Sequence, residues 1–331
     1  MTSRTTPQAH RAALDHVLAL AAGAPWCEGL VLRGSTALLA WLPDTARPPA
    51  DLDWVVRPSR AVPVDPLHPY PYLDDLDPVL AWPEAAHGAG RPELWCPEGL
   101  DGPGGTAARL PPEGLHWVVE PEEEDTPPYG DLLDLLARHP VVAPGLRLDP
   151  DSARTGGSWA YREYDTPGVR LTVPWRADGL PPGAVRLEFT FDEPLPDPPV
   201  RVPVPRADGG PPTVVAAASP ELSLAWKLLW LLTEGGGDGP GKARGKDLYD
   251  AVLLAELPGV RPSPRLLRTV LGRCPHPVGP DAVRRLRVDW AGFPGAAADR
   301  LDRLARALEH GGGSEQLGGR PHGGGPMTPR S

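Results

Sequence analysis

Residues 33–56 read RGSTALLAWLPDTARPPADLDWVV, and this stretch limits the possible folds more than any other part of the chain. The apolar residues that end at Gly34 predict a short strand. Ser35 and Thr36 are good N-cap residues for a helix that Pro43 would stop. DLDWVV, in which acidic residues precede apolar ones, predicts the next strand. The expected order is therefore strand, Gly-Ser turn, helix and acidic strand.

Asp51 and Asp53 are separated by one residue, so on a strand their side chains point to the same face. Two such carboxylates can hold a hard divalent cation such as Mg²⁺. Gly34 and Ser35 open a helix, where free backbone N–H groups and the Ser hydroxyl can bind a phosphate. Each feature also has an ordinary interpretation, because Asp-x-Asp pairs occur in solvated turns and Gly-Ser pairs cap many helices. Together and in this order they favour metal-dependent phosphoryl or nucleotidyl transfer.

Composition narrows the class of protein. The 331 residues are 40% hydrophobic, enough for one large or two ordinary domains with a proper core. The net charge of -10 argues against general electrostatic attraction to phosphate backbones, although a local basic groove stays possible. The three cysteines lack metal or redox spacing, and no apolar run reaches about 18 residues. We therefore expect a cytoplasmic protein with reduced thiols and no membrane span.

Hydrophobic spacing divides the chain into a mixed first part and a helical second part. The expected helices are 7–22, 35–42, 130–140, 219–234, 246–257, 263–274, 279–293 and 297–310, and the expected strands are 27–34, 51–56, 158–174 and 184–192. Weaker patterns suggest a short element at 78–82, a strand at 115–120, a solvated loop at 120–128 and a proline-rich link at 193–212.

LRGSTALLAWL followed by RPPADLDWVV resembles the entry motif of the nucleotidyltransferase superfamily, specifically of the AbiEii/AbiGii toxin-type nucleotidyltransferases. The family motif is a hydrophobic strand, Gly-Gly/Ser-Thr-Ala-Leu, and then Arg-x-Ser/Thr-x-Asp-Leu-Asp. Arg47, Asp51, Leu52 and Asp53 match it, whereas Pro49 stands where the family usually has Ser or Thr. The departure removes a hydroxyl and leaves both acids of the implied metal site in place.

A second resemblance lies in the C-terminal half. The family carries a helix with Ala-x-Lys and then a helix with Arg-x-x-Lys/Arg-Asp-Leu-x-Asp. LAWKLLWLL and ARGKDLYDAVLL are similar to these at Lys227, Arg244, Lys246, Asp247 and Asp250. The resemblance covers about 28–56 and 184–254.

A third carboxylate is implied by the strand AVRLEFTFD, which occupies the place of the family strand that supplies it. The resemblance implies Glu188 for this role, with Arg186 on the same strand face. Without the family, the favoured interpretation of Glu188 is an outward-facing residue of a half-solvated sheet.

The resemblance implies an α/β (α+β) fold, with a nucleotidyltransferase-like mixed sheet, flanking helices and a helical C-terminal region. The expected domains are a catalytic domain with proline-rich insertions at 1–215, a helical region closing the nucleotide site at 216–310, and a disordered tail at 311–331.

The implied activity is Mg²⁺-dependent transfer of a nucleoside monophosphate from a nucleoside triphosphate (NTP). The acceptor would be a hydroxyl of an RNA, such as a tRNA 3' end, or of a protein. The setting would be a toxin–antitoxin or phage-defence system, with an antitoxin protein as possible partner.

The resemblance also assigns site residues. Asp51, Asp53 and Glu188 would hold the metal, and Gly34, Ser35 and Thr36 would contact the phosphates. Lys227 and Lys246 would offset negative charge at the triphosphate, with Asp247 beside them.

Other interpretations remain open at this stage. Lys227 could extend its ammonium from an apolar helix face to water, and Asp247 could be an acid that suits a helix start. Neither a Gly-x-Ser-x-Gly elbow nor a Walker-type loop is present. Net acidity argues mildly against an RNA acceptor. The runner-up function is a catalytically inactive nucleotide-binding or scaffold protein of the same fold.

Overall fold

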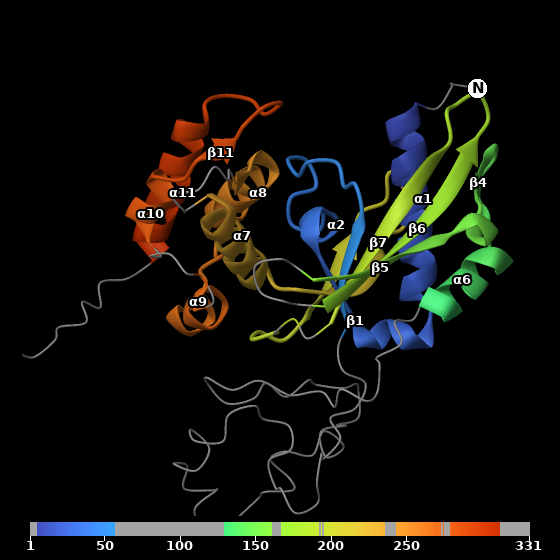
Figure 1. Cartoon of the computed structure of the whole chain (residues 1–331), viewed down its shortest axis with the longest axis horizontal. Helices are drawn as coiled ribbons and strands as arrows, with labels where there is room; N and C mark the ends of the chain where they lie inside the picture. The colour runs from blue at the N-terminus through green and yellow to red at the C-terminus, as the bar shows by residue number, and fades with distance from the viewer. Residues whose placement is uncertain are drawn as a thin grey trace, which may run out of the picture.

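A computed structural model describes residues 5–56, 129–160, 167–191, 193, 195–235, 243–272, 274 and 279–311. Its centre is a nine-stranded mixed sheet with the order β3-β4-β6-β7-β2-β1-β9-β8, in which β5 also pairs with β6 (Figure 1). The strands are β1 (Leu30–Arg33), β2 (Leu52–Val56), β3 (Val141–Ala143), β4 (Leu146–Leu148), β5 (Arg154–Ala160), β6 (Pro167–Ala177), β7 (Gly183–Thr190), β8 (Val200–Val204) and β9 (Thr213–Ala217). The pairs β2–β7 and β1–β9 are parallel, and the others are antiparallel.

One face of this sheet is covered by α1 (Thr6–Ala22) and α6 (Tyr129–Arg138) (Figure 1). At the start of α1 the backbone N–H of Thr5 donates to the Gln8 carboxamide oxygen at 2.9 Å, which fixes the first turn. Strand residues that alternate with the polar ones point to this face and are buried, among them Trp54 and Trp175. This face therefore holds the core of the sheet.

The other face of β1 and β2 meets the helical C-terminal region. That region contains α7 (Pro220–Gly235), α8 (Gly245–Glu256), α9 (Pro264–Leu271), α10 (Pro280–Arg284) and α11 (Ala297–Gly311), with the small parallel pair β10 (Ala243–Arg244) and β11 (Val288–Asp289). Val31 and Val55 from the sheet join the buried side chains of these helices in one hydrophobic cluster, together with Leu38 of the short helix α2 (Gly34–Leu38). The α/β class with a helical C-terminal region is thus confirmed.

Several boundaries differ from the sequence expectations. The strand expected from Cys27 begins at Leu30, because Pro25–Gly29 forms a 3₁₀ turn, η1. The second helix ends at Leu38 rather than near Leu42. The region expected as one helix over 279–293 forms α10 and then β11. A local pattern did not reveal β11, because its partner β10 is distant in sequence.

The proline-rich link expected at 193–212 contains a strand. Val200–Val204 forms β8, which pairs with β9 in an antiparallel register. Pro203 cannot donate a backbone hydrogen bond, but β8 lies at the end of the sheet order, and an edge strand needs donors on one side only. The strands β3 and β4, which precede and follow the turn at Gly145, were also missed.

Some expectations lie outside the described residues: the elements at 78–82 and 115–120, the loop at 120–128, and the tail apart from Gly311. In the described part of the chain, no helix is both long enough and apolar enough to cross a membrane.

Candidate active site

Three carboxylates converge where β2 and β7 run side by side. Asp53 lies opposite Glu188 in the parallel register of these strands, and Asp51 lies two residues before Asp53 on the same face. One carboxylate oxygen from each of the three residues lies within 4.8 Å of the others. We call Asp51, Asp53 and Glu188 the carboxylate triad. Its donor set of three carboxylates from a rigid sheet fits a divalent cation such as Mg²⁺, which prefers oxygen ligands.

The electrostatics of the triad favour a cation. Burial and the neighbouring charge of Asp51 raise the pKa of Asp53 to about 7, with Glu188 adding to the effect and with Arg33 and Lys246 opposing it. Burial disfavours the charged form of this carboxyl, and three carboxylates this close also repel one another when all are ionised. A bound divalent cation would favour the ionised forms and remove this repulsion.

Gly34 brings the chain directly against the triad. Its φ is +71°, a left-handed conformation that glycine adopts without strain, and a Cβ at this position would lie 2.1 Å from Oδ2 of Asp53. The cross-strand pairing of Arg33 with Asp53 produces this approach. The absence of a side chain at position 34 therefore makes room for the carboxylate of Asp53 itself.

Ser35 and Thr36 follow Gly34 and are both buried. The Thr36 hydroxyl donates to the backbone carbonyl of Asp51 at 2.8 Å, which fixes the turn that carries the first acid. Oγ of Ser35 has no hydrogen-bond partner among the described residues. An unpartnered buried hydroxyl is costly, which makes this atom an exception among buried polar groups.

Lys227, Asp247, Asp250 and Arg47 form a buried charge cluster beside the sheet. Nζ of Lys227 lies 2.6 Å from Oδ1 of Asp247 and 3.0 Å from Oδ2 of Asp250. The Arg47 guanidinium donates to both carboxylate oxygens of Asp250 at 3.1 to 3.2 Å. The cluster thus joins α7, α8 and the loop that leads into β2.

Opposite charges decide the protonation states in this cluster. Burial by itself lowers the pKa of Lys227, but the charges of Asp247 and Asp250 outweigh it, and the pKa is raised above its usual value. Burial by itself raises the pKa of Asp247, but the charge and hydrogen bond of Lys227 outweigh it, and that pKa is lowered. Both groups are therefore charged at neutral pH.

The expected site residues fall into two groups. Gly34 stands directly against Asp53 of the triad, with Ser35 and Thr36 next in the chain. Lys227 and Asp247 belong to the buried charge cluster. Lys246 precedes Asp247 on α8, and its charge lowers the pKa of Asp53, which places it within electrostatic reach of the triad. Asp250 and Arg47, from the two motifs, pair with each other.

Two further arginines at the site were not singled out from the sequence. Arg33 is buried, donates to Oγ1 of Thr190 at 2.7 Å, and lies over the Trp226 and Trp230 rings at 5.5 and 5.7 Å. It thereby connects the sheet to α7. An arginine that ends an apolar strand immediately before the Gly-Ser turn was the signal that could have identified it.

Arg170 lies opposite Glu188 on β6, and its Nε and Nη2 approach Oε1 of that acid at 2.8 and 2.6 Å. Arg186 lies 3.9 Å from Asp51, so both outer acids of the triad have an arginine neighbour. Strand alternation predicted the face of Arg186, but the pairing of β6 with β7 was needed to place Arg170.

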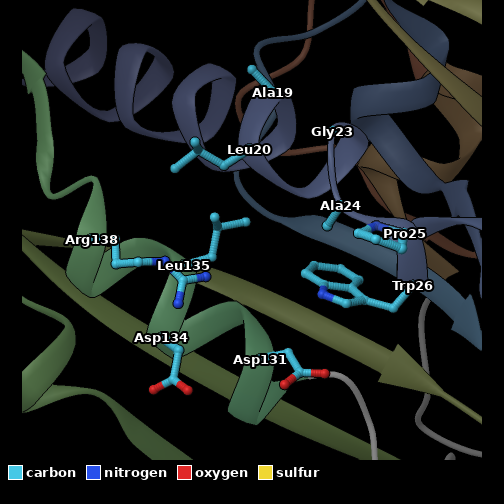
Figure 2. A pocket seen from close by; sticks show the side chains of 10 residues that line it. All are labelled: Ala19, Leu20, Gly23, Ala24, Pro25, Trp26, Asp131, Asp134, Leu135 and Arg138. Atoms are coloured by element: carbon cyan, nitrogen blue, oxygen red, sulfur yellow. The ribbon is translucent and has the colours of Figure 1, made fainter.

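A cavity of about 430 Å³ lies away from the triad, between α1, η1 and α6. Figure 2 shows Leu20 and Leu135 facing each other across it, Trp26 at one end, and the carboxylates of Asp131 and Asp134 at its edge. Because α1 and α6 cover the opposite sheet face, this cavity is not part of the carboxylate site.

Comparison with known proteins agrees with the geometry. A family model described as "Nucleotidyl transferase AbiEii toxin, Type IV TA system" matches residues 125–310, more than half of the 331 residues. The matched range includes Glu188, Lys227 and Asp247 and begins after Asp51 and Asp53. A search of curated proteins finds no match.

Proposed function

The chain belongs to the AbiEii family of nucleotidyl transferase toxins of type IV toxin–antitoxin systems, and we propose that it transfers a nucleoside monophosphate from an NTP to an acceptor hydroxyl. The acceptor is an RNA, such as a tRNA 3' end, or a protein, and the partner of the chain is an antitoxin protein. The convergence of Asp51, Asp53 and Glu188 beside Gly34 is the observation that carries the proposal.

The carboxylate triad would hold Mg²⁺, with one oxygen from each acid available as a ligand. Bound Mg²⁺ supplies positive charge that aligns the reacting oxygens and stabilises the leaving pyrophosphate. Arg170 and Arg186 hold the outer acids in position on the sheet. Asp53 or Glu188 would accept the proton of the acceptor hydroxyl at a carboxylate oxygen while the acceptor oxygen attacks the α-phosphorus.

Gly34 and Ser35 would contact the triphosphate. The missing side chain at position 34 lets the backbone lie directly against the Asp53 carboxylate, and the unpartnered Oγ of Ser35 can donate to a phosphate oxygen. Thr36 contributes by holding the backbone of Asp51.

Lys246 and Lys227 would supply positive charge near the triphosphate, in different ways. Lys246 is only half-buried, and its charge acts on Asp53, so it can reach a phosphate directly. Lys227 would first have to exchange Asp247 for a phosphate oxygen, because its ammonium is shared between two carboxylates. In the absence of that exchange, Lys227 and Asp247 position α8 and thereby Lys246.

The test is incubation of the purified chain with each α-³²P-labelled NTP and Mg²⁺, in the presence of total cell RNA or cell protein. The test variant is Asp51→Asn with Asp53→Asn, which removes the charges and keeps the side-chain shapes. Asp134→Asn, on the opposite face of the sheet, is the control. We expect label on one acceptor class, lost in the double variant and kept in the control.

Labelling that persisted in the double variant would contradict the metal assignment. Binding of NTP by the wild type without any transfer would instead favour the non-catalytic nucleotide-binding protein.

A further inference from the structure

Arginines gather on one face of the sheet, next to the carboxylate triad. Strand alternation places the buried residues of β4, β6 and β7 toward α1 and α6, and the residues between them toward the opposite face. On that opposite face stand five arginines, which we call the arginine face: Arg147, Arg154, Arg170, Arg176 and Arg186.

The strand register orders these residues into rows. Arg154 lies opposite Thr172, which lies opposite Arg186, and that row continues to Asp51. The neighbouring row carries Arg170 and ends in Glu188 and Asp53. Because adjacent strands are about 4.8 Å apart, the arginines of these two rows lie within a few strand widths of the triad.

Arg147 and Arg176 form a further row toward the other end of β6. The arginine face therefore extends from the triad along β6, over about four rows or roughly 20 Å at the usual strand rise. The arginine face is therefore an elongated surface and not a single binding point.

The side chains of all five arginines are exposed to solvent. The side chains of Arg170, Arg176 and Arg186 are 44%, 77% and 50% exposed, and Arg147 and Arg154 are also exposed. In Figure 1, α1 lies behind β6 and β7, and the C-terminal helices stand beside the sheet rather than over β5 and β6.

Acids on this face pair with three of the five arginines. Asp149 pairs with Arg176 at 2.9 Å, and Glu188 and Asp51 pair with Arg170 and Arg186. The last two acids are the ones that a metal ion would engage. No described acid pairs with Arg147 or Arg154 in a salt bridge.

We infer that the arginine face binds the phosphate backbone of an RNA strand and leads its end to the carboxylate triad. This inference rests on the proposed nucleotidyl transfer and makes RNA, rather than protein, the acceptor. Guanidinium groups match phosphate oxygens in geometry and charge. The net negative charge of the chain disfavours RNA binding in general, but the arginine face supplies positive charge locally.

A protein acceptor fits this face less well. Protein interfaces depend on buried aromatic or aliphatic anchors, but the large apolar side chains of β6 and β7, such as Trp175 and Phe189, point to the covered face. Of the described residues on the arginine face, the exposed large hydrophobic one is Val141 at its far edge.

The test measures RNA binding without turnover. Fluorescence anisotropy of a labelled single-stranded RNA of about twelve nucleotides is followed over a range of salt concentrations. The test variant replaces Arg147, Arg154 and Arg176 with Ala, since these residues do not contact the triad. The control replaces Arg138, Arg261 and Arg285, which are exposed on helices or loops elsewhere, so that both variants lose three positive charges.

We expect the arginine-face variant to bind RNA at least about tenfold more weakly near 0.1 M salt, with a salt slope smaller by about 2. The control should bind like the wild type, and replacement of the same three arginines with Lys should restore most of the affinity. Binding of NTP with Mg²⁺ should be equal in all four proteins, which also reports that they are folded.

Equal RNA affinity in the Ala variant and the wild type would overturn the inference. So would equal losses in the Ala variant and the control, because net charge alone would then explain them, or transfer of label to a protein in place of RNA. If the wild type binds RNA through these arginines but transfers no label, the proposed function fails while the RNA-binding surface stands.

Discussion

At the scale of single residues, the site depends on one close approach. Gly34 follows the last residue of β1, Arg33, which pairs with Asp53 of β2, and the backbone at Gly34 is left-handed. A side chain at position 34 would meet a carboxylate oxygen rather than a flexible hydrocarbon. The residue is therefore needed for two reasons, its backbone conformation and its lack of volume.

Gly34→Ala should abolish transfer and lower stability. The strain of a left-handed alanine costs about 1 kcal/mol, and displacement of Asp53 by the new methyl adds to it and disturbs the triad. The control is Gly179→Ala, because Gly179 has the same φ of +71° and a Cβ there would meet no atom within 4 Å. Urea unfolding should show a loss in both variants, and labelling should be lost only in the first. Full labelling by Gly34→Ala would contradict the tight packing at the triad.

At the scale of elements, the buried charge cluster joins three segments that are distant in sequence. Asp250 of α8 accepts from Arg47, which precedes β2, and from Lys227 of α7. The hydrophobic cluster around α7 and α8 surrounds these charges, so each depends on its partner for compensation. The cluster fixes where α8, and with it Lys246, lies relative to the sheet.

Asp250→Ala should destabilise the chain by about 3 to 5 kcal/mol, because it leaves the buried Lys227 and the half-buried Arg47 with too little compensating charge. Glu256→Gln, which breaks the exposed pair with Arg303, should cost less than about 1 kcal/mol. Urea denaturation followed by circular dichroism compares the two. A cost for Asp250→Ala as small as that of Glu256→Gln would show that the cluster is accessible to water.

At the scale of the whole molecule, the stability of the metal-free chain should depend on pH through the triad. The pKa of Asp53 is about 7 in the fold and about 3.9 in an unfolded chain. Between these values the folded state holds a proton that the unfolded state has lost, so the free energy of unfolding falls as pH rises from about 4 to 7. Above pH 7 this penalty is complete.

Thermal unfolding of the metal-free wild type and of Asp53→Asn over pH 4 to 8 measures this effect as the difference between the two curves. At pH values above 7, Mg²⁺ should raise the thermal unfolding midpoint of the wild type and leave that of Asp53→Asn nearly unchanged. The reason is that a ligand of the folded state stabilises it by mass action. Parallel curves for the two proteins would mean that Asp53 titrates normally.

Much of the architecture follows from local patterns. Helical spacing predicted α1, α6, α7, α8 and α11 closely, and the acidic start of β2 followed from DLDWVV. The strands β3, β4, β8 and β9 were missed because they are short, and β8 contains a proline. Their stability comes from pairing with neighbours, which a single window of sequence does not contain.

The sequence by itself determined the chemistry available at the site: two acids on one strand face, a Gly-Ser turn before them, and a Lys and Asp on later helices. Period-two alternation and glycine's conformational freedom are local properties, so they can be read from adjacent residues. Only the tertiary structure decided that Glu188 stands beside Asp53, that Lys227 is enclosed by Asp247 and Asp250, and that five arginines share a face. Those facts depend on strand register and helix packing, which bring together residues that are separated in sequence, such as Asp53 and Glu188, and no local pattern specifies them.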